Sequence, residues 1–208
     1  MKKTKRRKKS NTWVIKQHRD QFYKKSKILG YRSRSAFKLI ELNKKFNFLK
    51  KNSNVLDIGS SPGGWSQVAK ELVKKGKIVS IDLKNMEKIK DVRFIRCDFL
   101  ESDAKSLILS NFRSKIDVVI SDMAANTTGN KNLDCIRTNF LCSEVINFSR
   151  KILKPGGVLV SKLFMGEDFI EVKKLAKEKF KKVDFFKPES SRNESKETYI
   201  HCVSLKTL

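Results

Sequence analysis

Two charged side chains lie where a purely structural role is hard to find. Lys162 is inside the apolar stretch 158–164 (VLVSKLF), and Asp122 ends the apolar stretch 116–122 (IDVVISD). Burying an unpaired ammonium group costs several kcal/mol, so a lysine inside a strand needs a partner or a purpose. A lysine oriented by a carboxylate is suited to accepting or steering a proton. We therefore predict that Lys162 is functional.

Two further acids end neighbouring predicted strands. Asp82 lies at the end of 77–83 and Asp98 near the end of 92–99. In open α/β sheets, ligands bind at the carboxyl ends of the strands. Asp82 is placed to accept hydrogen bonds from ribose hydroxyls, and Asp98 from an adenine amino group. Either acid alone is also explained as a helix cap or a surface residue, but the pair favours a nucleoside site.

The loop 59–64 (GSSPGG) joins an apolar strand at 55–58 to a helix that begins at residue 65. Its glycines allow the backbone to approach a ligand closely. Ser61 and Pro62 interrupt G-x-G-x-x-G, and the Lys-Ser/Thr pair of an ATP-binding loop is missing. Proline has no N–H to offer a pyrophosphate. The loop therefore favours a nucleoside without phosphates, and S-adenosylmethionine is the common ligand of that kind.

The elements that must position these residues alternate along the chain. Strands are predicted at 55–58, 77–83, 92–99, 116–122, 158–164, 183–186 and 199–205, helices at 36–42, 65–75, 134–153 and 168–180, and a turn at 154–157. The last two strands follow each other without a helix, which predicts an antiparallel hairpin. This pattern predicts an α/β, Rossmann-like S-adenosylmethionine-dependent methyltransferase fold with a mostly parallel seven-stranded sheet and a C-terminal antiparallel hairpin.

We expect one catalytic domain, residues 30–208, preceded by a basic extension, residues 1–29. The net charge of +25 favours a polyanionic partner, although an AT-rich genome that encodes lysine at many polar positions explains part of it. Aromatics interleave with cations over 11–27, which suits stacking on single-stranded RNA and equally suits a short helix docking on the core. Residues 1–10 are expected to be disordered alone, as an RNA-contacting arm or a solubilising terminus.

Several classes of protein are disfavoured. The four cysteines lie far apart and the histidines lack companions at metal-ligand spacing, so neither a disulfide framework nor a metal site is predicted. No apolar run reaches the roughly 18 residues that a membrane helix needs. No apolar segment follows the basic N-terminus, as it would in a secretory signal. The sequence therefore predicts a cytoplasmic protein without a membrane span.

Five blocks of the chain resemble, in order, the motifs of the FtsJ/RrmJ family of RNA ribose 2′-O-methyltransferases. They are 31–39 (YRSRSAFKL), 57–67 (DIGSSPGGWSQ), 121–124 (SDMA), 161–164 (SKLF) and 196–200 (KETYI), and 188–192 (PESSR) is similar to the family's segment before its last strand. The resemblance extends from about residue 30 to residue 203. Ala125 replaces a proline of the family pattern, and Ser60-Ser61 replaces two small apolar residues, but neither change removes a reactive group.

The resemblance implies transfer of a methyl group from S-adenosylmethionine to a ribose 2′-OH of RNA without a metal. It implies the catalytic residues Lys38, Asp122, Lys162 and Glu197, and methyl-donor contacts at Gly63, Trp65, Asp82, Asp98 and Asp122. For Lys38, a snorkelling lysine explains the helical spacing equally well. The compact length is similar to that of bacterial members that modify a uridine of 23S (large-subunit) rRNA and support ribosome assembly, and a monomer is expected.

The four predicted catalytic residues would have different roles in the reaction. Lys162 would accept or steer the proton of the ribose hydroxyl, although a lysine acts as a base only when it is neutral, and the sequence leaves its protonation state open. Asp122 would orient Lys162, while Lys38 and Glu197 would position the ribose. Holding two reactants in attack geometry supplies as much as ~7–11 kcal/mol in ideal cases.

The RNA partner is less sharply defined. Arg32, Arg34, the N-terminal cations and the loop 191–196 are expected to contact phosphates. The alternatives are a tRNA or mRNA-cap ribose 2′-O-methyltransferase with the same catalytic set, and a non-catalytic RNA-binding ribosome-assembly factor on the same fold. The sequence also leaves open whether free RNA or an assembled ribosomal particle is recognised.

Overall fold

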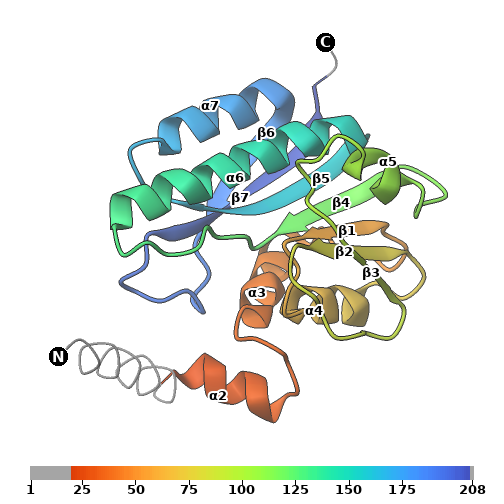
Figure 1. Ribbon diagram of the computed structural model, residues 1–208, viewed down its shortest axis with the longest axis horizontal. Coiled ribbons are helices and arrows are strands. Elements are labelled where there is room, and N and C mark those ends of the chain that lie inside the picture. Colours follow the sequence, from red (N-terminus) through yellow and green to blue (C-terminus); the bar gives the residue numbers. More distant parts are fainter. Residues whose placement is uncertain (1–19, 207–208) are drawn as a thin grey trace.

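The computed structural model describes residues 20–206, so the arm predicted at 1–10 lies outside the described residues. The strands are β1 (Val55–Ile58), β2 (Ile78–Asp82), β3 (Val92–Arg96), β4 (Ile116–Ser121), β5 (Leu153–Phe164), β6 (Phe180–Phe186) and β7 (Glu197–Leu205). The helices are α2 (Gln21–Ile28), α3 (Ala36–Phe46), α4 (Gly64–Leu72), α5 (Ala104–Leu109), α6 (Lys131–Ile152) and α7 (Phe169–Lys179). Figure 1 shows α2 beside the rest of the molecule and the long α6 lying along the sheet.

All seven strands form one sheet in the order β3-β2-β1-β4-β5-β7-β6. Strands β1 to β5 run parallel, and β7 lies antiparallel between β5 and β6. This confirms the predicted mostly parallel seven-stranded sheet with a C-terminal antiparallel hairpin. The order reverses between β1 and β4, where open α/β sheets bind ligands.

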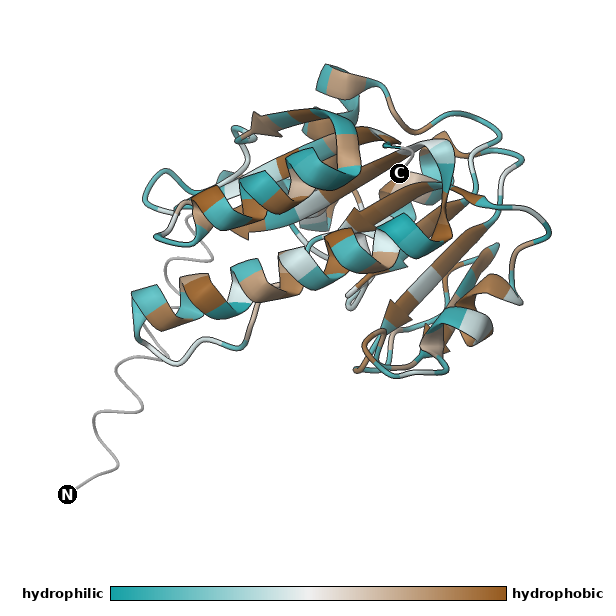
Figure 2. Cartoon of the chain, turned by 90° about the horizontal axis from the view of Figure 1, so that it is seen from above, coloured by the Kyte–Doolittle hydropathy of each residue, from teal (hydrophilic) through white to brown (hydrophobic). Residues whose placement is uncertain are grey.

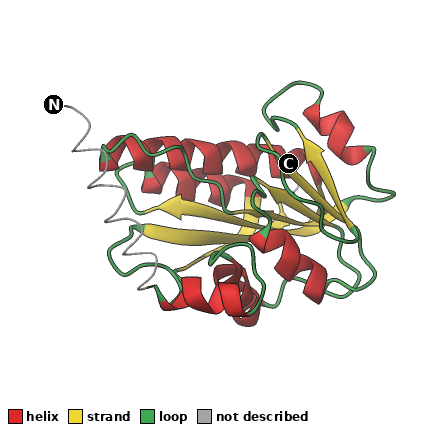
Figure 3. Cartoon of the chain, turned by 60° about the horizontal axis from the view of Figure 1, so that its bottom comes forward, coloured by secondary structure: helices red, strands yellow, loops and turns green. Residues whose placement is uncertain are grey.

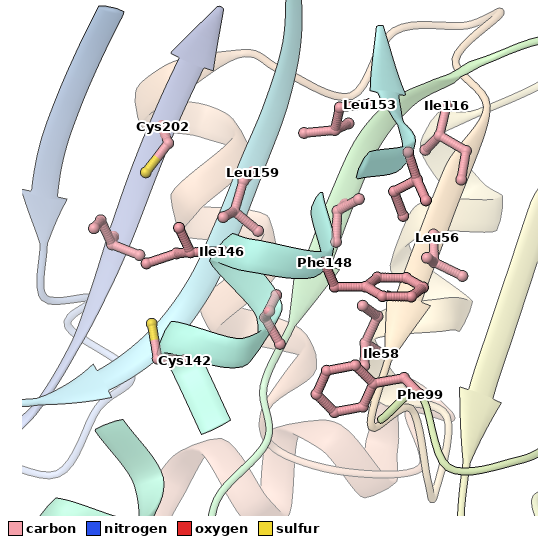
Figure 4. Packing of buried hydrophobic residues seen from close by; sticks show 14 of the residues in the cluster. Leu56, Ile58, Phe99, Ile116, Cys142, Ile146, Phe148, Leu153, Leu159 and Cys202 are labelled. Carbon is pink, nitrogen blue, oxygen red and sulfur yellow. The ribbon is translucent and has the colours of Figure 1, made fainter. Parts of the chain in front are cut away.

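Helices cover both faces of the sheet (Figure 3). On one face, α5, α6 and α7 pack over a core that includes Leu56, Ile146 and Leu159, and Figure 4 shows these side chains between α6 and the strands. On the other face, α3 and α4 bury Leu39 and Trp65. Because both faces are covered, the central strands are apolar along most of their length, as the brown strands of Figure 2 show.

The structure differs from the predicted elements at two places. The stretch 154–157 does not separate a helix from a strand, because α6 ends at Ile152 and β5 starts at once with Leu153. Leu153 pairs with Ile116 and Val158 with Val118, so the residues between them, of which 154–156 are exposed, form an irregularity within β5. Helix α5 was also missed, since its six residues are too few to show a clear helical period.

Within residues 20–206, no helix has the length and apolar character needed to cross a membrane. The same part of the chain contains no group of three or more His, Cys, Asp or Glu side chains placed to hold a metal ion.

Candidate active site

The register of the sheet brings the predicted catalytic residues together at one edge. Ser121, the last residue of β4, pairs with Ser161 of β5, so Asp122 leaves the sheet next to Lys162. On the other side of β5, Lys162 pairs with Tyr199 of β7. Side chains alternate along a strand, so Glu197 points to the same face as Tyr199. Lys38, in the first turn of α3, approaches from the helix layer on that face.

Lys162 is held by Asp122. Its Nζ atom lies 2.7 Å from the Asp122 backbone oxygen and 3.1 Å from Oδ1 of the same residue. The lysine is only 7 % exposed, so the contact is shielded from water and worth more than a surface ion pair. The two predicted partners therefore meet directly.

Glu197 links the two lysines. Its Oε1 and Oε2 atoms lie 2.7 and 2.8 Å from the Lys38 Nζ, and Oε2 lies 3.9 Å from the Lys162 Nζ. Ser191 donates a hydrogen bond of 2.7 Å to Oε1. Two ammonium groups and two carboxylates thus alternate in one cluster, which compensates every buried charge in it.

Tyr199 is a further member of the cluster to which the sequence reasoning gave no role. Its hydroxyl donates a hydrogen bond of 2.6 Å to Asp122 Oδ1. Its ring is fully buried, and the centroid of this ring lies 5.7 Å from that of Trp65. The signal for it was present, because Tyr199 lies two residues after Glu197 on the same strand. Alternation along β7 places both on one face.

The cluster keeps Asp122 ionised. Burial raises the pKa of the Asp122 carboxyl, but the charges of Lys162 and Lys38 and the hydrogen bond from Tyr199 outweigh burial, so the net pKa is below its usual value. For Tyr199, burial and the neighbouring charges of Asp122 and Glu197 raise the pKa well above the usual value. The tyrosine is therefore a neutral hydrogen-bond donor to a carboxylate.

A cavity of about 770 Å³ opens beside this cluster. Asp82, Asp98 and Asp122 all line it, together with Gly59 and Met123. The three predicted acids are thus brought to one cavity at the carboxyl ends of the parallel strands. Its size and the carboxylates on its wall suit a nucleoside ligand.

Asp82 and Asp98 also support their own loops. Asp82 accepts hydrogen bonds from the backbone N–H groups of Ser61 (2.9 Å) and Lys84 (2.7 Å), and Asp98 accepts one from Leu100 (3.0 Å). Both acids are partly exposed, and a carboxylate has lone pairs left after such contacts. Their loop-stabilising role and the predicted ligand contacts are compatible.

The glycine loop is shaped by close packing. Gly59 has a φ of +74°, and a Cβ there would lie 1.9 Å from the Cγ atom of Met123. Gly63 has a φ of +112°, but its Cβ would face the Arg32 guanidinium at 2.9 Å. Gly59 is thus the glycine of this loop that keeps room at the cavity wall, and a ligand contact at Gly63 stays a prediction.

Trp65 is 2 % exposed, and its Nε1 donates a hydrogen bond of 2.9 Å to the Ser35 backbone oxygen. It borders a second cavity of about 120 Å³, which also reaches Asp57 and Asp122. Trp65 therefore lines the smaller cavity and not the larger one, and its ring packs against Tyr199. A direct contact between Trp65 and a methyl donor stays a prediction.

Asp57, at the base of the glycine loop, is a titratable group that the sequence reasoning left without a role. It is buried and accepts a hydrogen bond of 2.6 Å from the Ser66 hydroxyl, which also contacts Ser80. Burial raises the pKa of Asp57 to about 7, although the Ser66 hydrogen bond lowers it and the charges of Asp122 and Asp82 raise it further.

The two arginines expected to hold RNA have partners within the protein. Arg32 donates to the backbone oxygens of Pro62, Glu87 and Lys88. Arg34 donates to the Ser190 backbone oxygen and pairs with Asp20. Both guanidinium groups therefore hold loops of the protein in place through their backbone oxygens. A sequence does not distinguish an arginine that binds phosphate from one that binds carbonyl oxygens, because the same N–H donors serve both.

This chain is similar to proteins of a known family. A model of the family described as FtsJ-like methyltransferase matches residues 31–205. A Pelagibacter ubique protein named ribosomal RNA large subunit methyltransferase E is 48 % identical over 197 residues, which cover 95 % of this chain and 97 % of that protein. A protein of the same name from Rickettsia akari is 43 % identical over 203 residues, covering 95 % and 89 %.

Among solved structures, a Plasmodium falciparum protein assigned as a ribosomal RNA methyltransferase matches with a TM-score of 0.76 and 35 % identity, over 84 % of this chain and 98 % of that chain. Human methyltransferase-like protein 13, solved with SAH, matches with a TM-score of 0.57 and 15 % identity, over 81 % and 79 %. This second likeness concerns the fold alone.

Proposed function

The chain belongs to the FtsJ-like methyltransferase family, and we propose that it transfers a methyl group from S-adenosylmethionine to the ribose 2′-oxygen of an RNA nucleotide. The observation that carries the proposal is the contact between Lys162 and Asp122 beside the acid-lined cavity. A binding protein has no need for two lysines held in a largely buried cluster around an acid that lines a nucleoside cavity. A transferase that must manage a proton there does need them.

The described residues fit the methyl donor. Asp82 and Asp98 offer acceptors for ribose hydroxyls and an adenine amino group, and Gly59 keeps the wall of the cavity open. No cluster of lysines or arginines lines this cavity as a triphosphate would require, since among its lining residues the cations are Lys84 and Arg137. When bound, the donor supplies an electrophilic methyl group on a positively charged sulfur.

The protein's own contribution is to position the ribose hydroxyl and to handle its proton. Asp122, which lines the cavity, holds the Lys162 amine at 3.1 Å, so the position of this amine is fixed relative to the cavity wall. Lys38 and Glu197 form the opposite side of the cluster and are placed to hold the ribose. Preorganised charges of this kind act without reorganisation during the reaction, which is why they are effective in a site shielded from water.

The relatives suggest the RNA. Both bacterial relatives carry names that state large-subunit ribosomal RNA as the substrate, and we propose the same substrate class here, with a uridine as the target nucleotide. The protein would then act in the cytoplasm as a monomer, on rRNA or on an assembled ribosomal particle. A tRNA or mRNA-cap target is less favoured because neither relative carries such a name. A purely RNA-binding role is opposed by the complete buried cluster.

The test is transfer of a labelled methyl group to large ribosomal subunits that lack the modification. We expect the wild-type protein to produce 2′-O-methyluridine. Lys162→Ala should abolish transfer while leaving S-adenosylmethionine affinity within a few-fold, because the lysine contacts Asp122 but is not among the residues that line the cavity. Lys174→Ala, a matched change of an exposed lysine on α7, should retain full activity. A Lys162→Ala protein that kept most of its turnover would contradict the assignment.

A further inference from the structure

We propose that Asp20 is a positioning residue for the active site, acting through two arginines and the loop 188–196 on Glu197. The proposal rests on the proposed function, because it explains how the carboxylate of Glu197 is kept beside Lys38. Asp20 is far from Glu197 in sequence and precedes the first described helix. Its contacts nevertheless lead to the catalytic cluster in a continuous series.

Asp20 makes two kinds of contact. As the N-cap of α2, its Oδ1 atom accepts hydrogen bonds of 3.1 Å from the backbone N–H groups of Phe22 and Tyr23. Its other oxygen, Oδ2, pairs with Arg34 and lies 3.8 Å from the Arg192 Nε. The side chain is 10 % exposed, so a surface helix cap does not describe it fully. It is a partly buried carboxylate between two cations.

These arginines reach the loop that supports Glu197. Arg192 belongs to the loop, and Arg34 donates a hydrogen bond to the Ser190 backbone oxygen. From α3, the Glu41 carboxylate accepts hydrogen bonds from the N–H groups of Glu189 (2.6 Å) and Ser190 (3.1 Å). The next residue is Ser191, whose hydroxyl donates to Glu197. The loop is therefore fastened on both sides of the residue that holds Glu197.

The charge of Asp20 is needed because Arg34 has an alternative acidic partner in Glu197. Arg34 is half-buried, and its Nε atom has no hydrogen-bond partner among the described residues. Burial lowers the pKa of Arg34, while the charges of Asp20 and Glu197 raise it. Without the Asp20 charge, Arg34 would keep its attraction to Glu197 and would compete with Lys38. Glu197 would then be displaced from the position in which it holds the ribose.

Two substitutions separate the charge from the helix cap. Asp20→Asn keeps a good N-cap but removes the charge, whereas Asp20→Glu keeps the charge with a poorer cap. On full-length protein and large ribosomal subunits, we expect Asp20→Asn to lower kcat about tenfold or more, the scale of one charged hydrogen bond. The S-adenosylmethionine affinity, the KM for RNA and the melting temperature should change little. Asp20→Glu should restore most of the kcat.

Asp91→Asn is the matched control, because Asp91 is exposed and pairs with Lys70 at 3.1 Å away from the cluster. It should leave kcat unchanged. Hydrogen exchange provides a readout that does not need catalysis: Asp20→Asn should speed exchange of the loop 188–196 relative to Asp91→Asn. This separates the two proposals, since an inactive wild type with the expected exchange result would contradict only the proposed function.

Four results would overturn the positioning role. The first is a kcat of Asp20→Asn equal to that of the wild type. The second is equal loss in Asp20→Asn and Asp20→Glu, which would show that the charge is not what matters. The third is unchanged exchange in the loop 188–196. A loss of kcat accompanied by a large fall in melting temperature would likewise show a merely structural role.

Discussion

At the scale of single residues, the active site depends on compensation among buried charges. Lys38, Glu197, Lys162 and Asp122 alternate in sign, and each lies within 4 Å of an opposite charge. Removing one member leaves its neighbour buried and uncompensated, which is strongly destabilising. Conservative substitutions that keep the shape are therefore the informative ones, and the two neutral donors, Tyr199 and Ser191, allow them.

Tyr199→Phe removes the hydroxyl that donates to Asp122 at 2.6 Å and keeps the ring against Trp65. The lost hydrogen bond to a charged acceptor is worth about 1.5–3 kcal/mol. We expect kcat to fall by roughly one to two orders of magnitude on that basis, with S-adenosylmethionine affinity nearly unchanged. Steady-state kinetics with labelled methyl donor measure this. A wild-type kcat in Tyr199→Phe would show that Lys162 alone orients Asp122.

Asp57 makes stability depend on pH. Its pKa is raised from 3.8 to about 7 on folding, so between these values the folded protein binds a proton that the unfolded chain has released. The free energy of unfolding of the unliganded protein should therefore fall as pH rises through this interval. Asp122, whose pKa is lowered, acts in the opposite sense and mainly below it. Thermal melting across pH should show the decline in the wild type.

The control for this pH dependence is Asp57→Asn, which keeps an acceptor for Ser66 but does not titrate. Its melting temperature should be flatter over the same pH interval than that of the wild type. Parallel curves for the two proteins would assign the dependence to another group.

At the scale of elements, Gly59 is the position of the glycine loop where an added side chain would collide with Met123 of the cavity wall. Gly59→Ala would combine a left-handed φ of +74° with a Cβ placed 1.9 Å from Met123. Gly129→Ala has a similar φ of +95° but open space around it. Both should lose about 1–2 kcal/mol of stability from the backbone conformation, and Gly59→Ala should lose more.

The effect on ligand binding separates these two variants. Only Gly59→Ala should weaken S-adenosylmethionine binding, because Met123 must move within the cavity wall. Calorimetric titration with the methyl donor measures this directly. Equal affinities in the two variants would contradict the role given to Gly59.

Much of the architecture could be predicted from local pattern. Apolar strands, the interrupted glycine loop and the final hairpin predicted the sheet. A charge inside an apolar strand indicated Lys162, and a charge at a strand end indicated Asp122. The local pattern could not predict features that depend on contacts between elements distant in the sequence. Arg32 and Arg34 looked like phosphate ligands but bind backbone oxygens of loops more than 25 residues away. The start of β5 at Leu153 depends on pairing with Ile116, which overrides the turn preference of 154–157.

At the scale of the whole molecule, the charge of +25 should govern RNA affinity. Deleting residues 1–10, which contain seven lysines or arginines and no acidic residue, should weaken RNA binding and flatten its dependence on salt. The affinity for S-adenosylmethionine should not change, because the cavity is formed by residues 58 to 141. Filter binding at several salt concentrations measures the slope, and an unchanged slope would indicate a solubilising terminus.

The central claim is that the buried cluster directs a methyl group to a ribose oxygen of large-subunit RNA. The most direct measurement maps 2′-O-methyl groups on cellular RNA from cells that contain the wild-type protein, the Lys162→Ala variant or no protein. We predict one large-subunit rRNA uridine that carries the 2′-O-methyl group only with the wild type. A methyl group on a base, a site in another RNA, or an unchanged site with Lys162→Ala would contradict the account.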